Sequence, residues 1–391
     1  MLPSRILVSG AGIAGLTFAI ELKRHGFEPV VIEREPGLRR EGYMMDFFGT
    51  GWDVASRMGL AERLRAVRYP IETGEFIDAA GEAYAHFPVE RLRAALDNKY
   101  VYLRRPDLER ILAERAREVG VEIRYGQSLA ALEDRGAAVL ARFVRGGEET
   151  FALAVGADGM HSRVRDLVFG AQGHFARFLG LYVAAFHLPS RGFSIGRKLE
   201  LYEEADRAVF LYPLSATQLD ATLVFRHAEM TIPHDNRIGV LRDIYRDSGW
   251  IVQDVITAYT GDEPIYFDSV TQIVMPQWHK GRIALIGDAC GCLTLLAGQG
   301  SHMAMAGGYV LAQELARQPN HKAAFAAYQK FLKPAVDKRQ RDARRFVRIV
   351  VPTARSRPWL RRLFIRMFFS ALALRYGLAF FGSRSVLAGY D

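Results

Sequence analysis

The sequence lacks several features that would mark particular protein classes. It has two cysteines in 391 residues, Cys290 and Cys292, which excludes a disulfide-stabilised scaffold. No internal repeat or low-complexity linker is evident, and no group of His, Cys, Asp and Glu has metal-ligand spacing, so we predict no metal site. Half of the residues are apolar, which supports a large buried core, and the length allows two or more domains.

Net positive charge is confined to the C-terminal part of the chain. The net charge is +9, but the segment from Lys330 onward holds fifteen Lys and Arg against three Asp, so it carries +12 and the preceding residues −3. Arginines interrupt the apolar run from Arg357 to Phe381, which argues against a spanning helix. We predict no nucleic-acid partner; docking on the protein body and peripheral contact with an anionic membrane both stay open.

A secretion signal is also not evident. The apolar run over residues 4–9 leads directly into a glycine motif that requires a strand at this point, so we interpret it as a strand rather than a signal peptide. We therefore expect a cytoplasmic protein.

The N-terminal segment has the pattern of a βαβ unit. Strands over 4–9 and 29–33 flank a helix over 13–25, and the turn between the first strand and the helix has the spacing GxGxxG at Gly10, Gly12 and Gly15. Such glycines allow a tight turn, the approach of a pyrophosphate to the helix N-terminus, and close packing of helix and strand. Glu33 ends the second strand, where an acid binds a ribose diol. The pattern predicts dinucleotide binding without separating FAD from NAD.

The rest of the chain alternates helices and strands except in one region. Short aromatic and alternating runs between 178 and 225 have no helix among them, which indicates an antiparallel sheet inserted into an α/β frame. Helices are predicted over 106–119, 237–248 and 303–318.

Two further glycine motifs follow strands. The first is the segment 156–165, with Asp158, Ser162 and Arg165; the second is 281–289, with Asp288 after the strand, followed by Gly298-Gln299-Gly300 before a helix. Each segment alone is also compatible with a simple turn and helix cap. One extended ligand that spans both sites would explain why they occur together.

These four patterns, GxGxxG with Glu33, Arg105-x-Asp-Leu, DGxxSxxR and GDA followed by GQG, occur in the order found in a known family. The chain resembles the class A flavoprotein monooxygenases, aromatic hydroxylases similar to p-hydroxybenzoate hydroxylase, and looks most like the tetracycline-inactivating flavin monooxygenases. The resemblance covers about residues 1–345. It implies an α/β fold with a three-layer FAD-binding domain on a parallel sheet, an inserted antiparallel substrate-binding sheet and a C-terminal helical tail.

The resemblance also implies domain boundaries. The FAD-binding domain would comprise 1–70, 100–175 and 268–340, the substrate-binding domain 71–99 and 176–267, and the C-terminal helical segment 341–391.

The family's site residues carry over by position. Gly10, Gly12, Ala14, Gly15, Glu33 and Arg34 would hold the ADP half of FAD. Arg39 and Arg105 would contact the ribityl–pyrophosphate region, and Asp288 the ribityl–phosphate region. Asp158 would serve both FAD and a transiently bound NADPH or NADH. The isoalloxazine ring would lie against Gly298, Gln299, Gly300 and Ser301. Met45, Tyr182, Tyr212 and Phe225 are candidates for the substrate pocket.

The chain departs from the family near the expected flavin ring. Cys290-Gly291 replaces the usual Ala-His, Leu295 replaces a proline, and His302 replaces an asparagine. We interpret both cysteines as buried thiols rather than redox partners, and His302 as a structural replacement rather than a proton donor.

Three functions are compatible with these residues. The resemblance implies an NAD(P)H- and O2-using monooxygenase that hydroxylates a hydrophobic, ring-containing small molecule through a flavin C4a-hydroperoxide. The altered loop and the basic, apolar tail leave open a flavin-dependent reductase of a lipid or prenyl substrate, and a flavin-loaded ligand-sequestering protein is the third. The sequence allows a monomer or a homodimer.

Overall fold

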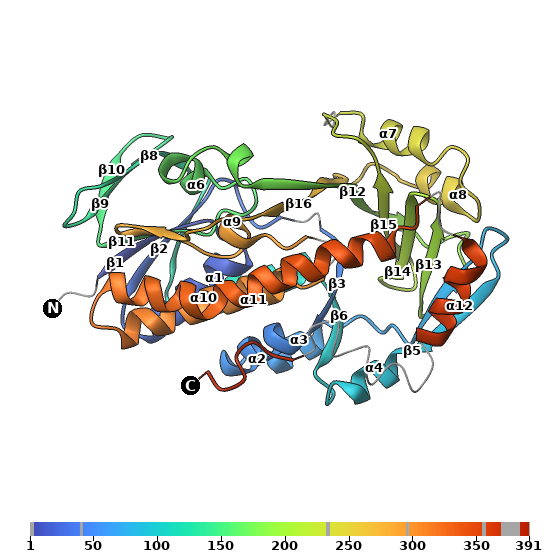
Figure 1. Cartoon of the computed structure of the whole chain (residues 1–391), viewed down its shortest axis with the longest axis horizontal. Coiled ribbons are helices and arrows are strands. Elements are labelled where there is room, and N and C mark those ends of the chain that lie inside the picture. The colour runs from blue at the N-terminus through green and yellow to red at the C-terminus, as the bar shows by residue number, and fades with distance from the viewer. Residues whose placement is uncertain are drawn as a thin grey trace.

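The computed structural model describes residues 4–39, 42–231, 235–294, 296, 298–353, 357–368 and 384–390. These residues form two bodies, each built on its own β-sheet, and long helices cross the first body (Figure 1). Leu295 and residues 369–383 of the C-terminal segment lie outside the described residues.

The first body contains a six-stranded sheet. In pairing order its strands are β17 (His279–Lys280), β18 (Ile283–Leu285), β11 (Leu153–Gly156), β1 (Arg5–Ser9), β2 (Glu28–Glu33) and β7 (Glu122–Tyr125). The pairs are parallel from β18 to β7, and β17 is antiparallel to β18. Ile6, Leu7 and Val8 of β1 are fully buried, as expected for a parallel sheet covered on both faces.

Helices and a small sheet provide the covering layers. Helices α1 (Ile13–Arg24), α5 (Arg105–Glu118) and α10 (Gly300–Arg317) pack together, and the antiparallel sheet of β8 (Leu129–Asp134), β9 (Val139–Phe143) and β10 (Glu148–Phe151) lies on the opposite side of the main sheet (Figure 1). The three-layer α/β architecture expected from the sequence is therefore confirmed.

Helix α10 approaches α1 closely because Gly308 has no side chain. A Cβ atom at this position would lie 2.6 Å from the carbonyl oxygen of Ala14 and 2.8 Å from the amide nitrogen of Phe18. Helix α11 (His321–Val350) follows and extends to the second body (Figure 1), where Val347 packs beside Val224.

A seven-stranded sheet forms the second body. In pairing order its strands are β16 (Tyr266–Ile273), β12 (Ala176–Pro189), β15 (Gln218–Arg226), β14 (Arg207–Pro213), β13 (Lys198–Glu204), β4 (Thr73–Ile77) and β5 (Ala83–Pro88). The strands are antiparallel except for the parallel pair β13–β4. The antiparallel region expected between 178 and 225 is thus confirmed.

The two faces of this sheet pack against different partners. One face, which we call the outer face, forms a core with α7 (Arg237–Ile244) and α8 (Val252–Thr257). The other, the inner face, packs against the hairpin of β3 (Met44–Phe48) and β6 (Tyr100–Arg104). Because side chains alternate along a strand, neighbouring residues of β15 belong to different cores: Leu223 lies on the outer face and Val224 on the inner face.

Shorter helices connect these elements: α2 (Gly49–Arg57), α3 (Ala61–Ala66), α4 (Val89–Ala95), α6 (Arg163–Val168), α9 (Asp288–Gly291) and a 3-10 turn over Gln172–His174. The helix predicted over 237–248 ends earlier than expected, at Ile244, and α8 follows as a separate helix.

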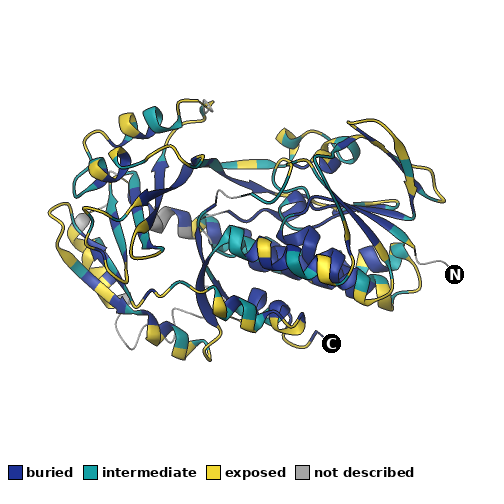
Figure 2. Cartoon of the chain, turned by 180° about the vertical axis from the view of Figure 1, so that it is seen from behind, coloured by how far each residue is buried: buried dark blue, intermediate teal, exposed yellow. Residues whose placement is uncertain are grey.

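The described part of the C-terminal segment docks on the second body. In α12 (Pro358–Phe368), Ile365 is buried in the inner-face core and Arg361 pairs with Glu203 of β13. Arg366 Nε donates to the carbonyl oxygen of Tyr84 at 2.7 Å. The other side of α12 is exposed (Figure 2). None of the described helices is both long enough and apolar enough to cross a membrane.

Candidate functional site

The first glycine motif forms a tight junction between two strand ends. Gly10 has φ +112°, and a Cβ atom there would lie 2.5 Å from the carbonyl oxygen of Ala157. A Cβ atom on Gly15 would overlap the carbonyl oxygen of Gly10. Helix α1 begins after Gly12 with no side-chain cap, so amides of its first turn are available to an anion.

Glu33 lies at the C-terminal end of β2, beside this turn. Its Oε2 accepts a hydrogen bond from Ala11 N at 2.9 Å, and its Oε1 accepts one from Glu35 N at 3.0 Å. Each carboxylate oxygen keeps a second lone pair, so Glu33 is fixed in place and can still accept from a ribose hydroxyl. Arg34 and Arg39 lie at the surface near Glu35. Glu35 Oε1 is 3.2 Å from Arg34 Nε and 4.0 Å from Arg39 Nη2.

The motif that contains Asp288 packs directly against the first one. Gly287 has φ +61°, and a Cβ atom there would lie 2.8 Å from the Cβ atom of Ala14. Asp288 Oδ1 lies 4.0 Å from the position of a Cβ atom on Gly300, at the start of α10. The structure therefore brings Gly10 to Gly15, Asp288 and Gly300 into one continuous region.

A buried polar cluster lies between these two motifs. Arg105 Nη2 is 2.8 Å from Glu109 Oε1, and Glu109 Oε1 lies 3.8 Å from the position of a Cβ atom on Gly12. Burial raises the pKa of Asp288, and the charge of Arg105 opposes this rise. Burial also raises the pKa of Tyr43, whose ring lies 5.3 Å from that of Tyr266. Tyr43 and Glu109 were not identified from the sequence, because no motif marks them.

The side chain of Asp158 contacts the start of α6. Its carboxylate accepts hydrogen bonds from Ser162 Oγ and, at 3.0 Å, from Val164 N, so it stabilises the start of α6. The backbone of Asp158 nevertheless lies against Gly10, with its Cα 2.9 Å from the position of a Cβ atom there. Asp158 therefore shapes the turn through its backbone, while its carboxylate serves the helix.

Arg165 joins the second and third motifs and was not predicted as a site residue. It is fully buried. Its Nη1 donates to the carbonyl oxygen of Ala289 at 3.0 Å, and its Nη2 donates to Met160 O at 2.7 Å and to Gln172 Oε1 at 3.2 Å. The sequence feature that could have identified Arg165 is its position three residues after Ser162 in the motif DGxxSxxR.

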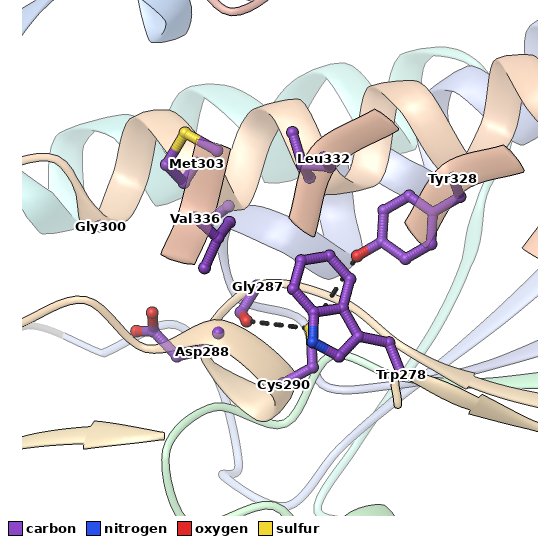
Figure 3. A pocket seen from close by; sticks show the side chains of 11 residues that line it. Trp278, Gly287, Asp288, Cys290, Gly300, Met303, Tyr328, Leu332 and Val336 are labelled. Atoms are coloured by element: carbon purple, nitrogen blue, oxygen red, sulfur yellow. Dashed lines mark hydrogen bonds between the residues drawn. The ribbon is translucent and has the colours of Figure 1, made fainter. Parts of the chain in front are cut away.

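A pocket lies between the turn of α9 and the helices α10 and α11 (Figure 3). Asp288 and Gly300 line one part of it, and Trp278, Tyr328 and Cys290 line another. Its other lining residues are Gly287, Gly291, Met303, Ala304, Leu332 and Val336.

The two cysteines beside this pocket are buried free thiols. Burial raises the pKa of both, which disfavours the reactive thiolate. Cys290 Sγ contacts Tyr328 Oη at 3.9 Å and Gly287 O at 3.5 Å. At Gly291 a Cβ atom would lie 2.9 Å from Val336 Cγ1 of α11, so glycine allows α9 and α11 to pack closely.

His302 is a buried, neutral side chain. Burial and the nearby Arg339 lower its pKa to about 3. Its Nε2 lies 3.1 Å from Asp46 O, and its ring packs against the rings of Phe47 and Phe48 at 5.2 and 5.0 Å. These contacts agree with a structural role, since a group with this pKa is not protonated near neutral pH.

Of the four candidate pocket residues, Tyr212 alone lies on the inner face of the second sheet. Tyr182 and Phe225 stack on each other in the outer-face core, with ring centroids 5.6 Å apart. Met45 is buried in the core of the first body. Tyr182 and Phe225 thus lie on the face turned away from the flavin-binding body, which the sequence could not show because the strand pattern defines two faces without indicating which one faces that body; the pocket role of Met45 stays a prediction.

The residues in this region have the chemistry that binding of FAD requires. The uncapped start of α1 suits a pyrophosphate and Glu33 a ribose, while Arg105 and Asp288 lead on to the glycines at the start of α10. In the described residues, no group of three or more His, Cys, Asp or Glu side chains is placed to hold a metal ion.

Comparisons with known proteins agree with this geometry. The sequence matches the family model described as FAD binding domain over residues 4–348. A flavin-dependent monooxygenase from Legionella longbeachae serogroup 1 is 33% identical over 344 residues, which cover 86% of this chain and 87% of that protein. The uncharacterized protein Rv1260 of Mycobacterium tuberculosis is 33% identical over 335 residues, covering 83% and 88%.

Solved structures show the same fold. Tetracycline destructase Tet(51) matches with a TM-score of 0.80 at 28% identity, covering 95% of this chain and 98% of that one. Klebsiella pneumoniae HpxO, complexed with FAD and uric acid, matches with a TM-score of 0.82 at 20% identity, covering 97% of both chains, and at this identity the likeness concerns the fold. The chain therefore belongs to the FAD-dependent class A flavoprotein monooxygenases.

Proposed function

We propose that the protein uses NADPH or NADH and O2 to hydroxylate a hydrophobic, ring-containing small molecule. The observation that carries this proposal is the continuous region from Glu33 to Gly300, together with the aromatic core between the β3–β6 hairpin and the inner face of the second sheet. Bound FAD would supply hydride acceptance and oxygen activation, the chemistry that side chains do not provide.

Separate residues would hold the two halves of the cofactor. The carboxylate of Glu33 would accept from the adenosine ribose, and the first amides of α1 would meet the pyrophosphate. Arg105, paired with Glu109, would balance the phosphate charge. Asp288 would accept hydrogen bonds from the ribityl hydroxyls. Its carboxyl group is buried, so these hydroxyls would replace the water that it lacks.

The second sheet would close the reaction site. Its inner face and the β3–β6 hairpin present Phe48, Tyr100, Tyr102 and Tyr212, an apolar and aromatic lining that suits a ring and excludes water. The chain has one GxGxxG motif, which supports transient binding of NAD(P)H at the flavin rather than in a domain of its own.

The proposal is tested with the FAD-loaded protein and a panel of ring compounds. Anaerobic flavin reduction by NADPH and by NADH is followed by its absorbance change, and products formed under 18O2 are analysed by mass spectrometry. We expect a substrate to accelerate reduction at least tenfold and its product to contain one 18O atom.

Two other results would replace this function. Anaerobic NAD(P)H-driven reduction of an alkene lipid, without 18O in the product, would identify a reductase. Tight binding of panel compounds without any NAD(P)H oxidation would identify a ligand-sequestering protein.

A further inference from the structure

Acidic and aromatic side chains meet where the β3–β6 hairpin faces the second sheet. Tyr100 and Tyr102 of β6 and Tyr212 of β14 belong to this inner-face core. Asp46 of β3 receives a hydrogen bond from Tyr100 Oη, and Asp220 of β15 is paired in register with Tyr212. We call these five residues the acidic tyrosine cluster.

The three tyrosine rings form a connected surface. The rings of Tyr100 and Tyr102 lie 5.3 Å apart and nearly perpendicular, at 83°. The rings of Tyr102 and Tyr212 lie 6.4 Å apart at 58°. Asp46 and Tyr212 are the two members of the cluster that keep part of their surface exposed.

Two aspartates and one arginine act on the tyrosines of the cluster. Burial raises the pKa of Tyr212, and Asp46, Tyr102 and Asp220 raise it further. Arg93 opposes the rise in the pKa of Tyr102.

Arg93 has partners of its own on α4 and beside it. It lies 3.5 Å from Glu90 and donates to the carbonyl oxygen of Ile71 at 3.5 Å. It therefore does not neutralise both aspartates of the cluster.

Asp220 is a buried carboxylate with incomplete hydrogen bonding. It has no exposed surface. Its Oδ1 accepts from Thr222 Oγ1 at 3.2 Å, whereas its Oδ2 receives no hydrogen bond and lies 3.4 Å from His187 Nε2. The other ring nitrogen of His187 lies 2.8 Å from Glu263 Oε2, so the histidine is shared between two carboxylates. The Oδ2 atom of Asp220 therefore depends on this longer contact with His187, and its hydrogen bonding is incomplete.

The cluster lies beside the expected flavin ring. The carbonyl oxygen of Asp46 is 3.1 Å from His302 Nε2, and His302 follows Gly300 by two residues at the start of α10. The backbone of Asp46 therefore adjoins the start of α10, the segment assigned to the isoalloxazine ring.

We propose that the substrate carries a protonated amine, which binds between the tyrosine rings and the carboxylates of Asp46 and Asp220. Tyrosine faces attract cations and the carboxylates supply the opposite charge, whereas a carboxylate-bearing ring would meet repulsion from both aspartates. The inference rests on the proposed function, because it identifies a substrate class for the same site.

Binding is measured with three probes that share one ring system. N,N-dimethyl-1-(naphthalen-2-yl)methanamine is cationic, 2-isobutylnaphthalene is its neutral isostere, and 2-naphthylacetate is anionic. Titrations of the FAD-loaded full chain are followed by the flavin absorbance. We expect the amine to bind at least tenfold more tightly than the neutral isostere, and the acetate more weakly than both.

Variants locate the preference. Asp46→Asn and Asp220→Asn keep the side-chain shape, and each should reduce the preference for the amine to threefold or less while leaving the affinity for 2-isobutylnaphthalene unchanged. Glu200→Gln is the matched control: Glu200 is a half-buried acid on β13 of the same sheet, paired with the outer-face residue Leu211, and burial raises its pKa to about 7. This control should keep the full preference.

Equal affinity for the amine and its neutral isostere overturns the inference, as does an undiminished preference in Asp46→Asn. Absence of binding by all three probes up to millimolar concentration counts against it equally. If Asp220→Asn fails to retain FAD, the result for Asp46→Asn alone determines whether the inference holds. Because these titrations need no turnover, they are independent of the 18O2 experiment that tests the proposed function.

Discussion

At the scale of single residues, Arg165 connects two motifs that are 124 residues apart in sequence. Replacing it by methionine removes the donor from the buried carbonyl oxygen of Ala289 and from the partly buried carbonyl oxygen of Met160. We expect Arg165→Met to lower the free energy of unfolding by about 3 kcal/mol and to weaken FAD binding. Urea denaturation and FAD titration measure these two effects.

Arg163 on the same helix provides the control for this prediction. It is exposed and donates to the carbonyl oxygens of Leu129 and Ala130 at 3.3 and 3.1 Å. Arg163→Met should change stability by no more than about 0.5 kcal/mol. Equal destabilisation by both variants would refute the bridging role of Arg165.

The sequence predicts residues well where the chemistry is local. The positions of Gly10, Gly15 and Glu33 follow from a turn, a close contact and a strand end, and the structure brings them together. The sequence is less informative where packing between distant segments determines the surroundings of a residue. Tyr182 and Tyr212 lie in similar aromatic strands, and only the tertiary structure shows that they occupy opposite faces of one sheet.

At the scale of elements, two adjacent glycines of α10 have opposite expected effects. In Gly308→Ala the new Cβ would collide with Ala14 O and Phe18 N of α1, so the two helices must separate. We expect a loss of about 2–3 kcal/mol in stability and weaker FAD binding, because α1 and α10 both begin at the cofactor region. Thermal unfolding and FAD titration test this.

Gly307→Ala serves as the comparison. The nearest atom to its Cβ would be Gly287 N at 3.4 Å, an ordinary contact, and alanine favours helix over glycine by up to about 1 kcal/mol. Stability should be unchanged or higher. A similar loss for both variants would show that the contact at Gly308 is not special.

Docking of α12 depends on one buried side chain and several polar contacts. Ile365 is buried, whereas Leu363 on the same helix is half-exposed. We expect Ile365→Asp to release α12 and to make cleavage by trypsin at Arg361, Arg362 and Arg366 at least tenfold faster. Leu363→Asp should leave the cleavage rate close to that of the unaltered chain, and equal acceleration by both would contradict this docking.

The βαβ unit and the antiparallel region were predictable because their hydrophobic periodicities are local. The end of the helix predicted over 237–248 was not, since Tyr245 leaves α7 to donate from its hydroxyl to Val224 O at 2.8 Å inside the second sheet. Patterns of three to four residues cannot anticipate such a contact between distant segments.

At the scale of the whole molecule, the cofactor region draws on three separate stretches of the first body: the turn at Gly10 to Gly15 with Glu33, the cluster at Arg105, and the segment from Asp288 to Gly300. A ligand that contacts all three couples them, and binding to the folded state alone stabilises the fold by mass action. At a thousand times its Kd, FAD should stabilise the chain by about 4 kcal/mol.

Fragments of FAD divide this effect between the two halves of the site. We expect FAD to raise Tm by several degrees and ADP, which lacks the flavin, by less than half as much. Glu33→Gln should reduce both shifts, whereas Asp288→Asn should reduce the shift with FAD and leave the shift with ADP unchanged. Calorimetry of each apoprotein with each ligand measures these six shifts.

Glu28 provides the control for these shifts, since it is exposed at the opposite end of β2, and Glu28→Gln should leave both ligand shifts intact. If ADP stabilised the chain as strongly as FAD, or if Asp288→Asn reduced the ADP shift, the region around Asp288 would not hold the flavin half. Only the first glycine motif would then be supported as a binding site, because this motif by itself is sufficient to bind the adenine half of a dinucleotide.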